Sequence, residues 1–197
     1  MTSVKRTITR ADILPMEQFK PIRAEKRAEI VALKKNRRVS VGPYATFYFE
    51  SFATMWMQVH EMLYIEKGGE EQIADELNAY NPLIPKGQDL VATVMFEIDD
   101  ERRRDTALRL LTGIEKTIYL EIDGARVFAR PETDLERTAD DGKTSSVHFV
   151  HFDLKPGAIA AFKSGSGTAV LGFDHPQYGH MAVIPPAIRQ ALASDLS

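Results

Sequence analysis

Apolar residues recur at helical spacing in the first half of the chain, whereas apolar and polar residues alternate as in strands in much of the second half. After Ser51, a plausible helix cap, apolar residues at positions 52, 56, 59 and 63 would form one stripe of a helix that ends near Lys67. Residues 145–153 alternate most clearly. The order of elements predicts an α+β fold, with N-terminal helices packed on a mainly antiparallel sheet formed by the C-terminal half.

Proline, glycine and capping residues set the ends of the expected elements. Pro21 predicts a kink or a restart in the first helix, and Asp123-Gly124 is typical of a hairpin turn. We expect residues 131–143 to form a polar loop. Helices are expected over residues 15–37, 51–67, 70–80, 100–111 and 156–163, with a last one after Pro186 to about Ser194. Strands are expected over residues 39–41, 45–49, 90–98, 116–122, 125–130, 145–153, 168–173 and 181–184.

The length of 197 residues fits a single domain, with a helical part over about 1–88 and a strand-rich part over about 89–197. Because no apolar segment approaches the roughly 20 residues that a membrane span needs, we expect no membrane association. The sequence has no cysteine, which excludes disulfides, thiolate zinc sites, iron–sulfur ligation and thiol nucleophiles. This composition suits a reducing compartment, so we expect a cytoplasmic protein.

Charge is distributed unevenly along the chain. Residues 1–38 contain 11 Lys/Arg and 4 Asp/Glu, a net charge of +7, and the remaining residues have a net charge of −10. The basic arm therefore either packs onto an acidic body, within one chain or across a dimer, or forms a patch for an anion or nucleic acid. The net negative charge of the whole chain disfavours a nucleic-acid-binding function. A cationic stripe on the first helix is either solvated or meets a carboxylate or phosphate: Lys20, Arg23, Arg27, Lys34 and Arg38.

The cationic pair Arg37 and Arg38 precedes an aromatic segment and then Glu50, Gln58 and Glu61, which together are the candidate ligand-binding residues. Gln58 and Glu61 are three residues apart, so one helix face presents both, and they could hydrogen-bond Arg37 or Arg38 across the turn. Two interpretations stay open, a structural Arg–Glu clamp or a pair that polarises a ligand. The aromatic density of the helix expected over residues 51–67 also makes that helix a candidate dimer face.

Two other segments resemble known catalytic or binding motifs but lack residues that those motifs require. The segment that begins at His60-Glu61 differs from a zinc-protease helix because Tyr64 occupies the second histidine position, so we expect a surface histidine there. Residues 164–167 lack the lysine and the following helix of a phosphate loop, which indicates a flexible turn.

Histidines of the strand-rich half are the remaining chemical candidates. His151, Asp174, His175 and His180 could supply nitrogen and oxygen ligands to zinc or iron if neighbouring strands bring them together. Isolated hydrogen-bonded histidines are the alternative. The sequence favours neither a metal nor a cofactor.

An ordered set of segments resembles an uncharacterised bacterial family known as a domain of unknown function, number thirty-five zero one. The segments include 33–39, 41–43, 49–50, 58–62, 80–85, 91–98, 175–178 and 191–196, so the resemblance covers nearly the whole chain. Members are small bacterial proteins without an assigned activity. The resemblance implies gene neighbourhoods with rubrerythrin-like and iron–sulfur oxidoreductase proteins, and hence a link to redox stress.

These observations lead to three hypotheses. The first is a non-enzymatic binding or accessory protein, a homodimer that uses the region of Arg37, Arg38, Glu50, Gln58 and Glu61 to bind a protein partner or a small anion. The second is a metal-dependent redox or hydrolytic enzyme that uses the histidines of the strand-rich half. The third is nucleic-acid binding through residues 1–38, which predicts a steep salt dependence.

Overall fold

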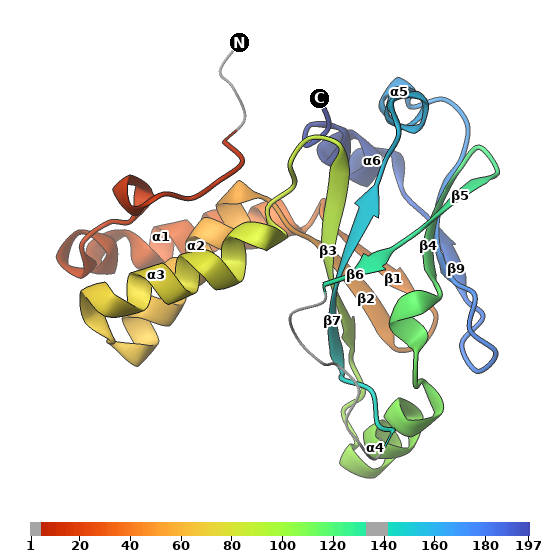
Figure 1. The fold of residues 1–197 in the computed structure, drawn as a ribbon, viewed down its shortest axis with the longest axis horizontal. Helices are drawn as coiled ribbons and strands as arrows, with labels where there is room; N and C mark the ends of the chain where they lie inside the picture. Colours follow the sequence, from red (N-terminus) through yellow and green to blue (C-terminus); the bar gives the residue numbers. More distant parts are fainter. Residues whose placement is uncertain (1–4, 133–141) are drawn as a thin grey trace.

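A helical arm projects from a body built on two β-sheets in the computed structural model, which describes residues 5–132 and 142–197 (Figure 1). Within these residues the arm contains α1 (Met16–Lys34), α2 (Phe52–Glu66) and α3 (Gly69–Tyr80), with the short 3-10 turns η1 (Arg10–Asp12) and η2 (Asn81–Leu83). The body carries the helices α4 (Glu101–Leu110), α5 (Pro156–Ser164) and α6 (Pro186–Ala193), and the turn η3 (Ile114–Lys116). No helix of the described part combines the length and the hydrophobicity needed to cross a membrane.

Both sheets are antiparallel throughout, so the α+β class is confirmed. One sheet has the order β1 (Arg38–Val41), β2 (Ala45–Phe49), β3 (Asp89–Phe96), β7 (Val147–Asp153), β6 (Arg130–Pro131). The other has the order β5 (Ala125–Phe128), β4 (Ile118–Ile122), β8 (Ala169–Phe173), β9 (Met181–Val183). Because β1 and β2 precede α2 in the sequence, the first sheet also draws on the N-terminal half of the chain.

The main core lies between the two sheets. Val39 and Val41 of β1 point into it, while Arg38 and Ser40 are exposed on the opposite face, as the two-residue period of a strand requires. Aromatic rings connect the layers, since Phe47 of the first sheet lies 5.4 Å from Phe173 of the second. Burying a side chain of this size contributes about 1.5–3 kcal/mol, so this interface is a principal source of stability.

A second, smaller core holds the arm to the body. Val59 and Leu63 of α2 pack with Ile73 of α3 and with Val91, which β3 presents on its outer face. β3 is therefore buried on both faces, by the second sheet on one side and by the arm on the other. This arrangement fixes the base of the arm on the central strand.

Most element ends follow local signals, with a few exceptions. Ser51 caps α2 as expected, because its hydroxyl accepts a hydrogen bond from the backbone N–H of Thr54. Asp123 and Gly124 both have positive φ angles, which confirms the hairpin turn between β4 and β5. Pro21 neither ends nor restarts α1; the helix continues through it and ends at Lys34, short of the expected position 37. The expected polar loop over 131–143 lies largely outside the described residues.

Candidate functional site

Arg37 and Glu50 are both buried, but they do not form the clamp that the sequence suggested. Arg37 donates hydrogen bonds from Nε to the carbonyl of Phe49 (3.0 Å) and from Nη2 to the backbone carbonyl of Glu50 (2.8 Å), and it forms an ion pair with Asp195. Burial raises the pKa of the Asp195 carboxyl, an effect that the Arg37 guanidinium opposes. Arg37 thus joins β2 to the C-terminal end of the chain and is not available to Gln58 or Glu61.

The other candidates near this region also have separate surroundings. The Glu50 carboxylate accepts hydrogen bonds from the hydroxyls of Thr54 (2.6 Å) and Thr93 (2.7 Å). Arg38 is exposed, and its side chain has no hydrogen bond or ion pair within the described residues. The Gln58 amide nitrogen lies 3.4 Å from the Tyr80 hydroxyl. The structure therefore does not bring these side chains to one open pocket.

Glu61 has an arginine partner from a different helix. Arg23 of α1 binds both carboxylate oxygens, at 2.8 and 2.7 Å, and its guanidinium lies 4.4 Å from the centroid of the Tyr64 ring. The cationic stripe of α1 thus meets a carboxylate at Arg23. This contact fixes α1 against α2 and holds the Tyr64 ring in place.

The four metal-ligand candidates have different partners. His151 lies between Glu132, 3.0 Å from Nε2, and Asp89, 3.6 Å from Nδ1. Because the two carboxylates approach opposite ring nitrogens, they cannot share one ion with His151. The other three candidates are engaged elsewhere: Asp174 with Arg126, His175 with the backbone of Gln177, and His180 against the ring of Tyr178. Within the described ranges no three histidine, aspartate or glutamate residues are placed to hold a metal ion.

His60 corrects the expectation of a surface histidine, because its side chain is fully buried. Its Nδ1 lies 2.8 Å from the Trp56 carbonyl, and its Nε2 accepts a hydrogen bond of 3.0 Å from the backbone N–H of Leu14. These partners require a neutral imidazole with its proton on Nδ1. Burial lowers the pKa of the His60 imidazole, which favours the same form.

The contact with Leu14 is one of several that fix residues 5–15, here called the N-terminal strap, across the arm (Figure 1). The Asn81 amide exchanges two hydrogen bonds with the backbone of Ile8, at 2.7 and 2.9 Å. The Trp56 indole donates to the Asp12 carbonyl (2.8 Å). Hydrogen bonds from Lys5 and from the Thr9 backbone lower the pKa of the Asp12 carboxyl to about 2.

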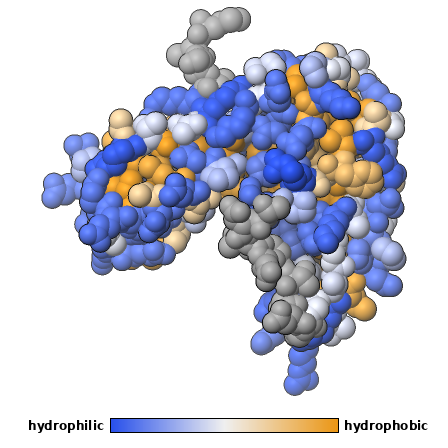
Figure 2. All heavy atoms as spheres, viewed as in Figure 1, coloured by the Kyte–Doolittle hydropathy of each residue, from blue (hydrophilic) through white to orange (hydrophobic). Residues whose placement is uncertain are grey.

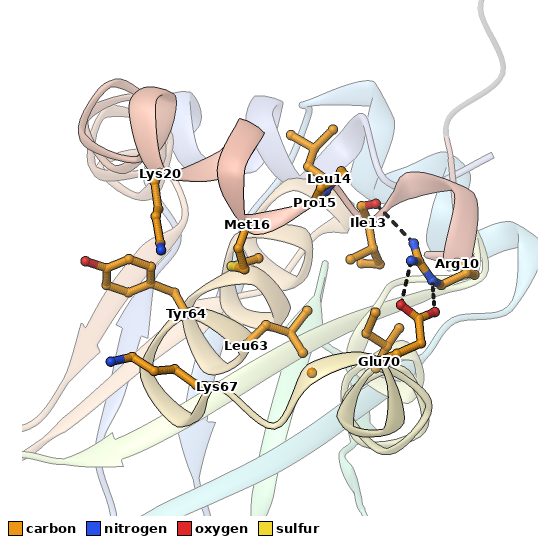
Figure 3. Close-up of a pocket in the computed structure, with 12 residues that line it drawn as sticks. Arg10, Ile13, Leu14, Pro15, Met16, Lys20, Leu63, Tyr64, Lys67 and Glu70 are labelled. Atoms are coloured by element: carbon orange, nitrogen blue, oxygen red, sulfur yellow. Dashed lines mark hydrogen bonds and ion pairs between the residues drawn. The ribbon is translucent and has the colours of Figure 1, made fainter.

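A pocket of about 420 Å³, here called the strap pocket, lies between the strap and the helices α2 and α3 (Figure 3). This volume is within the range of small-molecule sites in proteins. In the space-filling view, hydrophobic residues reach the surface of the arm among hydrophilic ones (Figure 2). The apolar lining comes from Ile13, Leu14, Pro15, Met16, Leu63 and Ile73, and the polar lining from Arg10, Lys20, Tyr64, Lys67 and Glu70.

The polar groups of the strap pocket are arranged asymmetrically. Arg10 and Glu70 neutralise each other through two hydrogen bonds of 2.5 and 2.8 Å, which tie the strap to α3. Lys20, Tyr64 and Lys67 lie on the other side of the pocket, beyond Met16 and Leu63 (Figure 3). Neither lysine side chain forms an ion pair or hydrogen bond within the described part of the chain. The pocket therefore offers uncompensated positive charge beside an apolar surface.

Lys67 also has an unusual backbone conformation, since its φ angle of 57° lies in the left-handed region. It ends α2 at a position that glycine or asparagine usually occupies. A lysine there costs roughly 1 kcal/mol relative to an unstrained position. Lys67 lines the pocket, and Figure 3 shows that its side chain extends on the side of Tyr64, away from Glu70.

Only part of this pocket has a signal in the sequence. Lys20 belongs to the cationic stripe already noted, but nothing in the stripe distinguishes it from a solvated residue. Lys67 precedes the glycines at 68 and 69, and glycine is the residue type that usually ends a helix in the left-handed conformation. The strap carries no pattern that predicts where it would lie, so the pocket could not be foreseen.

The comparisons agree with the sequence resemblance. The crystal structure of a novel protein of unknown function from Burkholderia pseudomallei K96243, at 1.90 Å resolution, matches with a TM-score of 0.90 and 41% identity over 97% of this chain and 100% of that one. A search of curated proteins finds no match. The family model described as "Protein of unknown function (DUF3501)" matches residues 7–196. The chain therefore belongs to this family of proteins of unknown function.

Proposed function

We propose that the protein is a non-enzymatic binding protein that holds a small organic anion in the strap pocket. The observation that carries the proposal is the pair of uncompensated lysines, Lys20 and Lys67, at one side of a largely apolar cavity. An anion with an apolar body would bury that body against Met16, Leu63 and Ile73 and place its charged group at the lysines. A carboxylate on an aliphatic or aromatic body has this chemistry.

The groups around the pocket favour binding over catalysis. Glu70 is held by Arg10, and both ring nitrogens of the adjacent His60 are engaged by backbone groups. A general base needs a free lone pair within reach of a substrate proton. Among the described residues that line the pocket, no nucleophile stands beside such a base.

The backbone at Lys67 supports the same interpretation. A strained conformation in a non-glycine residue often marks a site where side-chain placement matters more than local stability. Glycine would relieve the strain at φ 57° but would remove the ammonium group from the pocket. Lys67→Gly is therefore a variant that separates folding from binding.

The test uses decanoate as the probe, with decanol and acetate as comparison compounds. Decanoate at about 100 times its dissociation constant should stabilise the protein by about 2.7 kcal/mol, or roughly 5–10 °C in melting temperature. Decanol lacks the charge and acetate lacks the apolar body, so both should bind at least about tenfold more weakly. Isothermal titration calorimetry would measure the affinities directly.

The variant Lys67→Gly should keep or raise the melting temperature of the free protein while weakening decanoate binding about five- to tenfold. The matched control is Lys35→Ala, which removes an exposed lysine that does not line the pocket. Equal affinity of Lys67→Gly and wild-type protein for decanoate would refute the proposal, as would equal binding of decanol.

A link to redox stress, a homodimeric state and a cytoplasmic location remain proposals that rest on the sequence and on the family resemblance. The mass of the protein in solution would test the dimer. The alternative of a metal-dependent enzyme requires stoichiometric metal in the purified protein, which elemental analysis would detect.

A further inference from the structure

A second hollow lies beside α4. Figure 1 shows α4 on the body, away from the arm. Its volume is about 390 Å³, and none of its lining residues belongs to the strap pocket. We call this hollow the α4 groove and define it by these lining residues: Ile98, Arg102, Arg103, Ala107, Leu110 and Tyr178. The inference is thus independent of the proposed function.

Two arginines at the edge of the α4 groove have no charged partner among the residues that the structure describes. Arg102 and Arg103 form no side-chain hydrogen bond or ion pair within the residues described, whereas Arg104 turns back to the Ile98 carbonyl (2.9 Å). The carboxylate of Asp105 is already bound by Arg109 (3.0 Å) and Lys143 (2.7 Å).

The other acidic residues of this turn, Asp100 and Glu101, form no ion pair with the guanidinium group of Arg102 or Arg103 in the described structure. Asp100 accepts a hydrogen bond from the backbone of Arg103 as the helix cap, and Glu101 is exposed in the same turn. Arginines in the first turn of a helix are opposed by the helix dipole by about 0.3–1 kcal/mol. The stability of α4 therefore does not explain Arg102 and Arg103.

The floor of the groove is apolar and rigid. The side chain of Leu110 is 56% exposed, while Tyr178 is 3% exposed. The Tyr178 hydroxyl donates to the Val41 carbonyl (2.8 Å) and accepts from the backbone N–H groups of residues 44 and 45 (3.0 and 2.9 Å). These bonds fix the ring, so the groove is formed before a partner arrives, which lowers the entropic cost of binding.

We infer that the α4 groove docks an acidic segment of a partner protein that carries an apolar side chain. The apolar side chain would pack on Ala107 and Leu110, and carboxylates of the segment would pair with Arg102 and Arg103. Arginine and tyrosine are enriched at protein interfaces and at their energetic centres. The charge of the groove complements an acidic segment.

A nucleic acid is a poorer occupant for two reasons. Residues 39–197 carry a net charge of −10, which repels a phosphate backbone over most of the surface. The floor of the groove offers an aliphatic surface, whereas nucleic-acid channels use many cations and exposed aromatic rings. The groove thus favours a peptide.

The test titrates the intact protein into a fluorescein-labelled peptide of alternating leucines and glutamate pairs and follows fluorescence anisotropy. We expect saturable binding near about 100 μM that weakens with added salt. The double variant Arg102→Glu/Arg103→Glu should weaken it at least about tenfold, and Leu110→Ser about fivefold. Circular dichroism and thermal unfolding of each variant would show that the fold is intact.

The matched control is Arg27→Glu/Lys35→Glu, which makes the same change in net charge at exposed positions of α1 and its end. It should change peptide affinity by less than about twofold. Three results would overturn the inference: no saturable binding at about 1 mM peptide, equal losses in the two double variants, or a DNA oligonucleotide that binds more tightly than the peptide and is insensitive to Leu110→Ser.

Discussion

Protonation of His60 should destabilise the arm, because the native contacts of this side chain require a neutral ring. In the folded state Nε2 accepts the Leu14 N–H, and a proton on that nitrogen would replace the acceptor with a second donor. Burial lowers the pKa of His60 in the folded protein, whereas in the unfolded chain it is near the ordinary value of about 6.5. The unfolded state therefore binds a proton that the native state does not.

The sign and size of the effect follow from this difference. Stability from His60 is fully present above the unfolded pKa and falls as the pH drops from about 6.5 toward the lowered folded pKa. The slope cannot exceed about 1.4 kcal/mol per pH unit for one proton. Other groups also titrate in this range, so the informative quantity is the difference between wild type and a variant that cannot bind the proton.

The variant His60→Gln serves this purpose. It should cost about 1–3 kcal/mol at pH 7.5, where the Leu14 N–H loses a well-placed acceptor, but this cost should shrink by more than about 1 kcal/mol at pH 5. Urea unfolding followed by tryptophan fluorescence gives the free energy of unfolding at each pH. Trp56 is the single tryptophan of the sequence, and the centroid of its ring lies 3.9 Å from that of His60. The exposed His180 provides the control, His180→Gln. Parallel pH profiles for wild type and His60→Gln would refute this reasoning.

Three further changes probe polar contacts that hold the body and the start of α2 together. Asp195→Asn should lower the free energy of unfolding in urea by about 3–5 kcal/mol, because it leaves the buried Arg37 without its anion. The double variant Arg37→Met/Asp195→Leu should recover much of this loss. An Asp195→Asn protein as stable as wild type would contradict the ion pair. Glu50→Ala should cost about 1–3 kcal/mol, since the buried hydroxyls of Thr54 and Thr93 lose their acceptor, and Thr93→Val introduced with it should restore part of the stability in the same assay. Ser51→Ala should cost about 1 kcal/mol by removing the α2 cap, measured by thermal unfolding; no change in melting temperature would show that the cap does not contribute.

Most of the secondary structure follows from local sequence signals. Ser51 identifies the start of α2, and Asp123-Gly124 identifies the turn between β4 and β5, because a cap or a tight turn depends on residues a few positions apart. The alternation along residues 145–153 likewise identifies β7. Such patterns also predict which face of an element is buried, as for the stripe of α2 that includes Val59 and Leu63.

The partners of the charged and polar residues could not be obtained in this way. Arg37 and Asp195 are 158 positions apart, and His60 and Leu14 are 46 positions apart. Gln58 and Glu61 lie near Arg37 in the sequence, yet Glu61 pairs with Arg23 because α1 packs along α2. Proximity in sequence was a poor guide wherever a side chain had partners on several elements.

The sequence by itself determined the α+β class, the approximate elements and their apolar faces, because these depend on periodicity and on the conformations of single residues. Only the tertiary structure decided that the strands form two sheets, that the strap lies across α2 and α3, and that Lys20 and Lys67 line the same pocket. The physical reason is that many chain paths bury the same apolar faces. The path that is taken sets which polar groups, distant in sequence, become neighbours.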